Sequence, residues 1–190
     1  MKNLHGGFTL IELIAVIAII GLLSSLLIPE VSKFQDRARS VACMNNLRQI
    51  GVGVLGYVGD NNYEYPVIEP DPQNPVYPPA NDSTDPDAGI AKPMLDVLSP
   101  YGVTEAVLKC PADLKSPDPY YTKTDPHTSY QWRVTLDSEN ATAPKYYGGR
   151  RGYTVRIVKP SRVTICTDYQ NVHSGKMNRL YADGHVSVPN

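Results

Sequence analysis

Four side chains near the C-terminus are of types that bind metal ions or transfer protons: Asp168, His173, Asp183 and His185. Two imidazoles and two carboxylates form an adequate donor set for zinc or a similar ion. A hairpin that starts at Asp168 would bring the ends of its strands together. The same residues also have a structural interpretation, because Asp183-Gly184 is a strong turn signal and His173 can hydrogen-bond loop backbone. We favour the structural interpretation and predict no metal or other cofactor.

The rest of the chain carries no familiar catalytic pattern. No serine or cysteine stands at a recognisable family spacing from a histidine and an aspartate, and Cys110-Pro111 lacks any motif of a catalytic thiol. The formal net charge of −1 provides no bulk field that would attract nucleic acid. Lys145–Tyr153 combines cations with aromatic rings that could stack on single-stranded nucleic acid, but we interpret it as a mobile surface loop. The sequence predicts neither an enzyme nor a nucleic-acid-binding protein.

The longest apolar stretch lies at the N-terminus, from Phe8 to Ile28, and contains one ionisable side chain, Glu12. At about 1.5 Å rise per residue, a helix of this length spans roughly 30 Å, the thickness of a bilayer's hydrocarbon core. A secretory signal fits less well, since Ser24–Pro29 is a poor cleavage site. A plain membrane anchor leaves Glu12 unexplained, because an acidic residue at the centre of a membrane helix costs about 2.5–3.5 kcal/mol. The carboxylate therefore predicts a function for this helix beyond anchoring.

A glycine, an aromatic residue, a carboxylate and an apolar helix follow one another at set spacing in Gly6-Gly7-Phe8-Thr9-Leu10-Ile11-Glu12. This stretch resembles the processing site of type IV prepilins and type II secretion pseudopilins. The resemblance implies that a prepilin peptidase cuts after Gly7 and that the new N-terminal residue, Phe8, is N-methylated. It also matches Glu12 to the family's glutamate, and Pro29 to a proline that many members have.

The resemblance gives Glu12 a physical role in assembly. When such helices pack in a filament, a carboxylate on one can neutralise the charged amino-terminus of its neighbour. In low dielectric this pairing offsets much of the burial penalty, whereas an unpaired Glu12 would remain costly. The alternative, in which Glu12 lies among the lipid headgroups and reaches water, leaves the spacing from Gly7 as a coincidence. We therefore predict that Glu12 acts in assembly.

A second resemblance involves the C-terminal residues. His173 is followed by nine residues and then by Asp183-Gly184. This spacing resembles the His-x(9)-Asp-Gly signature of a large group of bacterial prepilin-like proteins. Three further stretches agree with the group: Cys43–Gly51, Asp60–Pro66 and Lys109–Asp113. The resemblance covers most of the chain and implies an architecture rather than an activity.

The expected fold is α+β and pilin-like: a long N-terminal α-helix packed on a small antiparallel β-sheet with long irregular loops. Apolar residues recur at spacings of three and four beyond Pro29, which predicts an amphipathic helix over residues 30–59 with a kink at the proline. Gly51-Val52-Gly53-Val54-Leu55-Gly56 matches a dinucleotide-binding fingerprint. It lies at the end of a helical pattern instead of between a strand and a helix, so we predict that these glycines let a sheet approach closely.

The C-terminal part of the chain alternates strand and turn signals. Proline-rich residues 60–90 predict an irregular acidic loop. Beyond it, we expect a short helix over Ala91–Leu98, a strand end at Val107–Cys110, and strands over residues 129–134, 155–158, 162–167, 178–182 and 185–188.

The predicted organisation is a leader at residues 1–7, a transmembrane and assembly helix at 8–29, and an exported globular domain at 30–190. Lys33 and two arginines follow the apolar segment closely, so charge alone would place the C-terminal side in the cytoplasm. The resemblance implies the reverse orientation. We follow it and predict a single pass through the inner membrane with the globular domain in the periplasm.

Three cysteines allow at most one internal disulfide: Cys43, Cys110 and Cys166. If the domain is exported, they face an oxidising space. A Cys43–Cys110 bridge would tie the long helix to the sheet side, and Cys166, in an apolar strand, is expected to be buried and free. The sequence alone does not decide the pair.

The function that these resemblances imply is that of a structural subunit of a type IV pilus or a type II secretion-like pseudopilus. The expected partners are further copies or other subunits of the filament, the prepilin peptidase, the inner-membrane assembly machinery and membrane lipid, without nucleic acid. Two alternatives remain: an exported module that uses the same anchor without polymerising and binds a glycan or another surface ligand, and a membrane-anchored enzyme that uses the C-terminal His/Asp cluster.

Overall fold

The computed structural model describes residues 9–68, 92–122, 127–133, 140–142, 145–147, 155–157, 159–169, 172–173 and 175–188. The chain divides into two compact units, Met1–Ala38 and Arg39–Asn190. The first helix, α1 (Leu10–Asp60), begins in the first unit and ends in the second.

The first unit consists of the N-terminal part of α1, where apolar side chains occupy every face of the helix. Each residue from Thr9 to Ile28 is exposed within the chain. A helix that is apolar all round is typical of a membrane span or the core of a large protein. Pro29 lies inside the unbroken helix, where its missing N–H removes one backbone hydrogen bond. The kink that we expect at Pro29 stays a prediction.

In the second unit, the C-terminal part of α1 buries one face. The buried residues follow one another at helical spacings of three or four: Cys43, Leu47, Ile50, Val54 and Val58. They belong to the hydrophobic core of the unit. The amphipathic helix predicted from this periodicity is therefore present, and it ends at Asp60.

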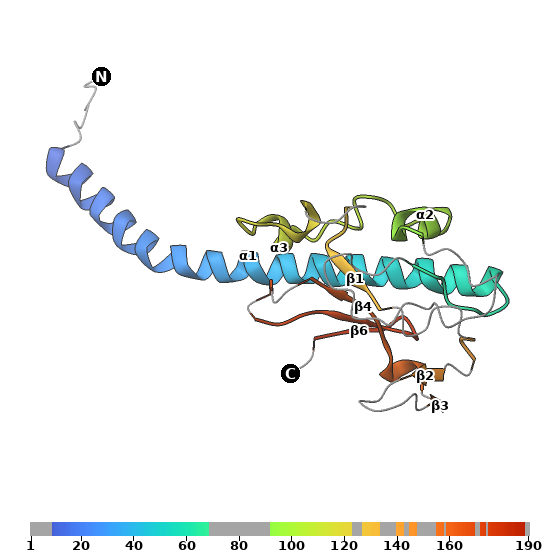
Figure 1. The fold of residues 1–190 in the computed structure, drawn as a ribbon. Helices are drawn as coiled ribbons and strands as arrows, with labels where there is room; N and C mark the ends of the chain where they lie inside the picture. Colours follow the sequence, from blue (N-terminus) through green and yellow to red (C-terminus); the bar gives the residue numbers. More distant parts are fainter. Residues whose placement is uncertain are drawn as a thin grey trace, which may run out of the picture. The chain divides into compact units, whose positions relative to one another are not determined.

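A four-stranded antiparallel sheet lies against this part of α1 (Figure 1). Its order is β1 (Tyr130–Trp132), β4 (Thr164–Asp168), β5 (Arg179–Tyr181) and β6 (Val186–Ser187). Cys166 pairs with Trp132 on one side and with Leu180 on the other. Four of the five β4 residues are buried, as expected for a central strand covered on both faces. The predicted α+β, pilin-like layout of long helix and small antiparallel sheet is thus confirmed.

Short elements surround the sheet. A separate two-stranded sheet pairs β2 (Lys145–Tyr147) with β3 (Val155–Ile157). Helical turns complete the described part: α2 (Met94–Leu98), η1 (Ser99–Tyr101), α3 (Pro111–Leu114), η2 (Tyr120–Thr122) and η4 (Pro160–Arg162).

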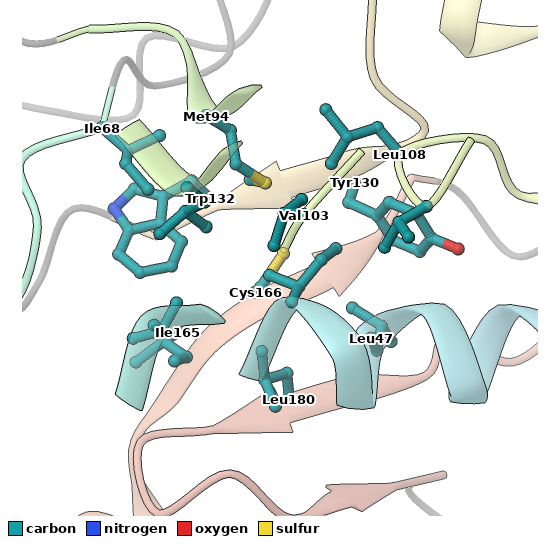
Figure 2. Close-up of a cluster of buried hydrophobic side chains, with 14 of the residues drawn as sticks. Leu47, Ile68, Met94, Val103, Leu108, Tyr130, Trp132, Ile165, Cys166 and Leu180 are labelled. Atoms are coloured by element: carbon teal, nitrogen blue, oxygen red, sulfur yellow. The ribbon is translucent and has the colours of Figure 1, made fainter. Parts of the chain in front are cut away.

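The core forms where α1, the sheet and the α2 segment meet. Figure 2 shows Leu47 of α1, Cys166 of β4 and Leu180 of β5 among the side chains that converge there. Met94 and Trp132 join them, and all five side chains are at most 4% exposed. Each large apolar side chain buried in this way contributes about 1.5–3 kcal/mol.

Three glycines of α1 allow close packing, as predicted, but against two different partners. A Cβ on Gly51 would lie 2.8 Å from Leu180 of β5, which is the sheet approach that we expected. Cβ atoms on Gly53 and Gly56 would instead lie 2.6 Å from Val103 and 2.9 Å from Tyr101. The C-terminal end of α1 therefore packs between the sheet and the segment around η1.

Two element predictions need correction. The strand end expected at Val107–Cys110 is wrong: residues 105–108 form turns, and α3 begins at Pro111, because proline is favoured in the first turn of a helix. Lys145–Tyr147, which we assigned to a mobile loop, forms strand β2. The other expected strands are present with shifted ends, while most of the predicted acidic loop, residues 69–90, lies outside the described residues.

Candidate functional site

The N-terminal part of α1 has the length and composition of a membrane-crossing helix. It is the one such helix in the described residues, and none of its apolar window is buried inside the chain. Leu10 is 76% exposed and Leu22 is 67% exposed. Apolar side chains exposed at this density are typical of a surface that contacts lipid or another apolar helix.

Glu12 lies in the first turn of this helix and caps its N-terminus together with Thr9. Thr9 donates its backbone N–H and its hydroxyl to Glu12 Oε2, at 2.8 and 2.7 Å. The Glu12 backbone N–H points back to Thr9 Oγ1 at 3.4 Å. This reciprocal arrangement is a capping box, in which residues three apart satisfy backbone donors that the first helical turn leaves free. Gly7 and Phe8 lie outside the described residues.

The C-terminal signature residues separate into two pairs. The first pair is buried: His173 Nε2 lies 3.0 Å from Asp168 Oδ2, with exposures of 4% and 0% for the two side chains. Asp168 Oδ2 also accepts the backbone N–H of Asn178 at 3.0 Å. The aspartate at the end of β4 thus holds both the histidine and the start of β5. The imidazole contacts a carboxylate instead of the loop backbone that we expected.

The second pair is exposed and belongs to the hairpin turn between β5 and β6. Asp183 Oδ1 accepts the backbone N–H of His185 at 3.3 Å and contacts its ring nitrogen Nδ1. Gly184 has φ +86°, a conformation that favours glycine, and a Cβ there would meet Leu55 of α1 at 2.9 Å. This pair therefore belongs to a turn that packs against Leu55 of α1. That its role is structural stays a prediction.

The four residues do not form one metal cluster. Among the described residues, the histidine, cysteine and acidic side chains that come close enough as a group of three are Cys43, Cys110 and His173. Cys43 and Cys110 are joined by a disulfide. The bridge links α1 to the residue before α3, and His173 Nε2 lies 3.6 Å from Cys110 Sγ. Cys166 is buried and free, as predicted.

One buried, hydrogen-bonded carboxylate, that of Asp113, was not recognised from the sequence. Asp113 is 2% exposed, and its carboxylate accepts the backbone N–H groups of Tyr120 and Tyr121 at 2.8 and 2.9 Å. It also accepts the Ser129 hydroxyl at 2.7 Å. The carboxylate joins α3, η2 and the start of β1 beside the disulfide. In the sequence, the one signal for Asp113 was that it ends the Lys109–Asp113 stretch that agrees with the prepilin-like group. This agreement says nothing about what the side chain does.

Comparisons with known proteins agree with the N-terminal geometry. The family of the prokaryotic N-terminal methylation motif matches residues 2–28. The chain is also 32% identical over 65 residues to a protein from Pseudomonas aeruginosa (strain PAO1) named type II secretion system core protein G. The match covers 34% of this chain and 45% of that protein, so the chain spans less than half the length of the curated relative. No solved structure matches significantly.

The match to the methylation motif covers the capped apolar helix, and the long helix followed by a small antiparallel sheet supplies the expected layout. On these grounds the chain is a prepilin- and pseudopilin-like protein.

Proposed function

We propose that the chain is a structural subunit of a filament of the type IV pilus or type II secretion pseudopilus kind, with no enzymatic activity. The observation that carries the proposal is the methylation motif over residues 2–28, which overlaps a helix whose apolar side chains are exposed in the described part of the chain. The relative named for type II secretion supports the pseudopilus branch for the residues that it matches. Self-association through this helix would bury its apolar surface.

The proposal includes processing of the N-terminus. A prepilin peptidase cuts after Gly7 and removes a leader of residues 1–7, and Phe8 then becomes an N-methylated terminus. Residues 8–29 form the transmembrane and assembly helix, and residues 30–190 form the globular domain. The protein is first held in the inner membrane by a single pass, with its globular domain in the periplasm. Membrane lipid and the inner-membrane assembly machinery are its partners before it enters the filament.

Glu12 acts in two ways in this proposal. Within one chain it caps α1, and both bonds from Thr9 go to the same oxygen, Oε2. Among the described residues, Oε1 takes part in no hydrogen bond that would compete with a neighbouring subunit. A carboxylate can therefore cap its own helix and still receive the charged amino-terminus of the next one. Leaving either charge buried without its partner costs about 3–5 kcal/mol.

The test of processing is mass analysis of the N-terminus of protein recovered from membranes. A terminus at Phe8 that carries one methyl group is the expected result. An intact Met1 would contradict both cleavage and methylation. A terminus within residues 24–30 would indicate a cleaved secretory signal instead of a retained assembly helix.

The test of assembly separates charge from capping. Glu12→Gln keeps a side-chain oxygen that accepts from Thr9, as glutamine does in capping boxes, but removes the charge. If charge pairing drives assembly, Glu12→Gln and Glu12→Ala both lose more than about a hundredfold in filament yield relative to the wild type, the factor that corresponds to 3–5 kcal/mol. Thr9→Ala, which removes the cap hydroxyl and keeps the carboxylate, still assembles. If Glu12→Gln forms filaments at wild-type yield, the charge is not needed for assembly and the role of Glu12 is limited to capping the helix.

A further inference from the structure

Two sulfurs, an imidazole and a carboxylate converge in the buried part of the second unit. Cys43 comes from α1, Cys110 from the residue before α3, and His173 from the segment between β4 and β5. One ligand atom from each of these three residues lies within 4.8 Å of the others. The cysteines are 0% exposed and His173 is 8% exposed. Such a set, closed to solvent, has the ligand types of a structural zinc site.

The distances already approach those of a tetrahedral zinc centre. With Zn–S near 2.3 Å and Zn–N near 2.0–2.1 Å, tetrahedral angles place a sulfur and a nitrogen about 3.6 Å apart. His173 Nε2 and Cys110 Sγ are 3.6 Å apart. His173 Nε2 and Asp168 Oδ2 are 3.0 Å apart.

The environment of Asp168 gives an independent indication of a cation. Its side chain is fully buried, and its second oxygen, Oδ1, has no hydrogen-bond partner among the residues that the structure describes. A buried carboxylate with one unsatisfied oxygen is costly, and a cation beside it removes that cost. The exposed Asp183–His185 pair has the same residue types without sulfur nearby, and it is fully explained by its turn.

We propose that reduction of the Cys43–Cys110 disulfide creates a site for zinc or a similar thiophilic divalent cation. Its ligands are the two Sγ atoms and His173 Nε2, and the buried Asp168 carboxylate beside the imidazole supplies a compensating negative charge. A dithiol reductant supplies two electrons and two protons, becomes a disulfide itself, and leaves two protein thiols. Zn²⁺ then displaces both thiol protons as the two thiolates bind. Re-oxidation by a disulfide-bearing oxidant re-forms the bridge and releases the ion.

The change in geometry that binding requires is local. As two ligands of one tetrahedral zinc ion, the sulfurs would be about 3.8 Å apart, farther than in any disulfide. Rotation of the two cysteine side chains provides this separation, while His173 and Asp168 stay in place. The site lies within the globular unit, so it does not depend on the proposed filament function.

The direct test uses the full chain in detergent micelles and Co²⁺ as the probe. The chain is reduced with a phosphine, the reductant is removed under inert gas, and Co²⁺ is titrated in. We expect one equivalent per chain, thiolate-to-cobalt charge-transfer absorption and the intense visible bands of tetrahedral cobalt. Zn²⁺ added afterwards should displace the probe. The oxidised chain should show none of these signals. Absence of stoichiometric binding in the reduced wild type would overturn the proposal.

Variants of the two histidines provide a matched comparison. His173→Ala should weaken Co²⁺ binding by more than about a hundredfold, and Asp168→Asn by about 10–100-fold, the range seen when groups around a metal are altered. His185→Ala and Cys166→Ala should bind as the wild type does. Equal binding by His173→Ala and His185→Ala, or loss of binding in Cys166→Ala, would contradict the assigned ligands.

A kinetic measurement on the unmodified chain avoids any folding defect of the variants. Zinc bound to both thiolates should slow re-formation of the disulfide by an added disulfide oxidant by more than about tenfold, because free thiolate is the attacking species. The rate is followed by trapping free thiols at intervals. An unchanged rate in saturating Zn²⁺ would show that the two cysteines do not bind the ion together.

Discussion

The two parts of α1 have the same secondary structure and opposite environments. From Leu10 to Ile28 every residue is exposed, whereas Leu47 and Ile50 are completely buried. Both parts are rich in apolar residues, so helix formation alone does not distinguish them. The first part has apolar residues all round and the second has them on one face, which lets one neighbouring sheet bury them. The first part is therefore organised around partners outside the chain, and the second around the chain's own core.

The comparison is tested most strongly at the disulfide, which fixes the second part of α1 to the rest of its unit. Cys43 and Cys110 are 67 residues apart, and a loop of this size stabilises by about 4 kcal/mol in the chain-entropy model. Replacing both cysteines by alanine should lower the free energy of unfolding by about this amount. Denaturant unfolding in micelles, followed by fluorescence of the single, buried Trp132, measures the effect. A change below about 1 kcal/mol would mean that packing alone holds α1 on the sheet.

A leucine from each part of α1 gives the next largest contrast. Leu47→Ala should cost about 2–5 kcal/mol, because it removes buried methyl groups and leaves a cavity. Leu23→Ala, at a side chain that is 55% exposed, should leave the unfolding curve of the globular part unchanged. The same Trp132 signal reports both variants. Equal destabilisation by the two substitutions would contradict the division of α1 into outward and inward parts.

Glycine-to-alanine substitutions in the two parts of α1 should have smaller but still opposite effects on stability. A Cβ at Gly53 would lie 2.6 Å from Val103 Cγ2, so Gly53→Ala should cost about 1–3 kcal/mol through overpacking. Gly21 has nothing within 4 Å, so Gly21→Ala should not destabilise and should favour the helix by about 1 kcal/mol. Circular dichroism and denaturant unfolding of the two variants distinguish these outcomes. Stabilisation by Gly53→Ala would show that η1 shifts away without cost.

The smallest effect concerns hydroxyl groups. The Tyr65 hydroxyl donates to Ala182 O at 2.9 Å across the core, so Tyr65→Phe should cost about 1 kcal/mol. Ser25 donates at 2.7 Å to Leu22 O of its own turn, and Ser25→Ala should leave the globular part unchanged. Both values come from the same unfolding measurement at neutral pH.

Alkaline pH adds a second readout for Tyr65. Burial raises the pKa of Tyr65 to about 12, whereas an unfolded tyrosine titrates near 10. The unfolded state therefore loses its proton first, and stability falls as pH rises from about 10 to 12. Tyr65→Phe should make this fall shallower. An unchanged slope would indicate that other buried tyrosines, such as Tyr130, control it.

The sequence was sufficient to predict turns and the buried face of a helix, but not which side chains from different segments lie in contact. Turn chemistry identified Asp183-Gly184, and helical periodicity identified the buried face from Cys43 to Val58. The pairing of Asp168 with His173, and of neither with Asp183, was beyond reach, because sequence spacing does not say which side of a hairpin each side chain takes. The strand expected before Pro111 failed since a short apolar run is compatible with both strands and turns.

The sequence by itself determined that α1 has two parts, an N-terminal part that is apolar all round and a C-terminal part that is apolar on one face. An uninterrupted apolar run of this length with one carboxylate predicts a membrane-spanning helix, and this prediction follows from composition and length alone. What only the tertiary structure decided is the neighbourhood of Cys43, Cys110, His173 and Asp168, which come from four separate segments. Their chemistry depends on distances of a few ångströms. Those distances are set by the packing of α1 on the sheet, which no local pattern specifies.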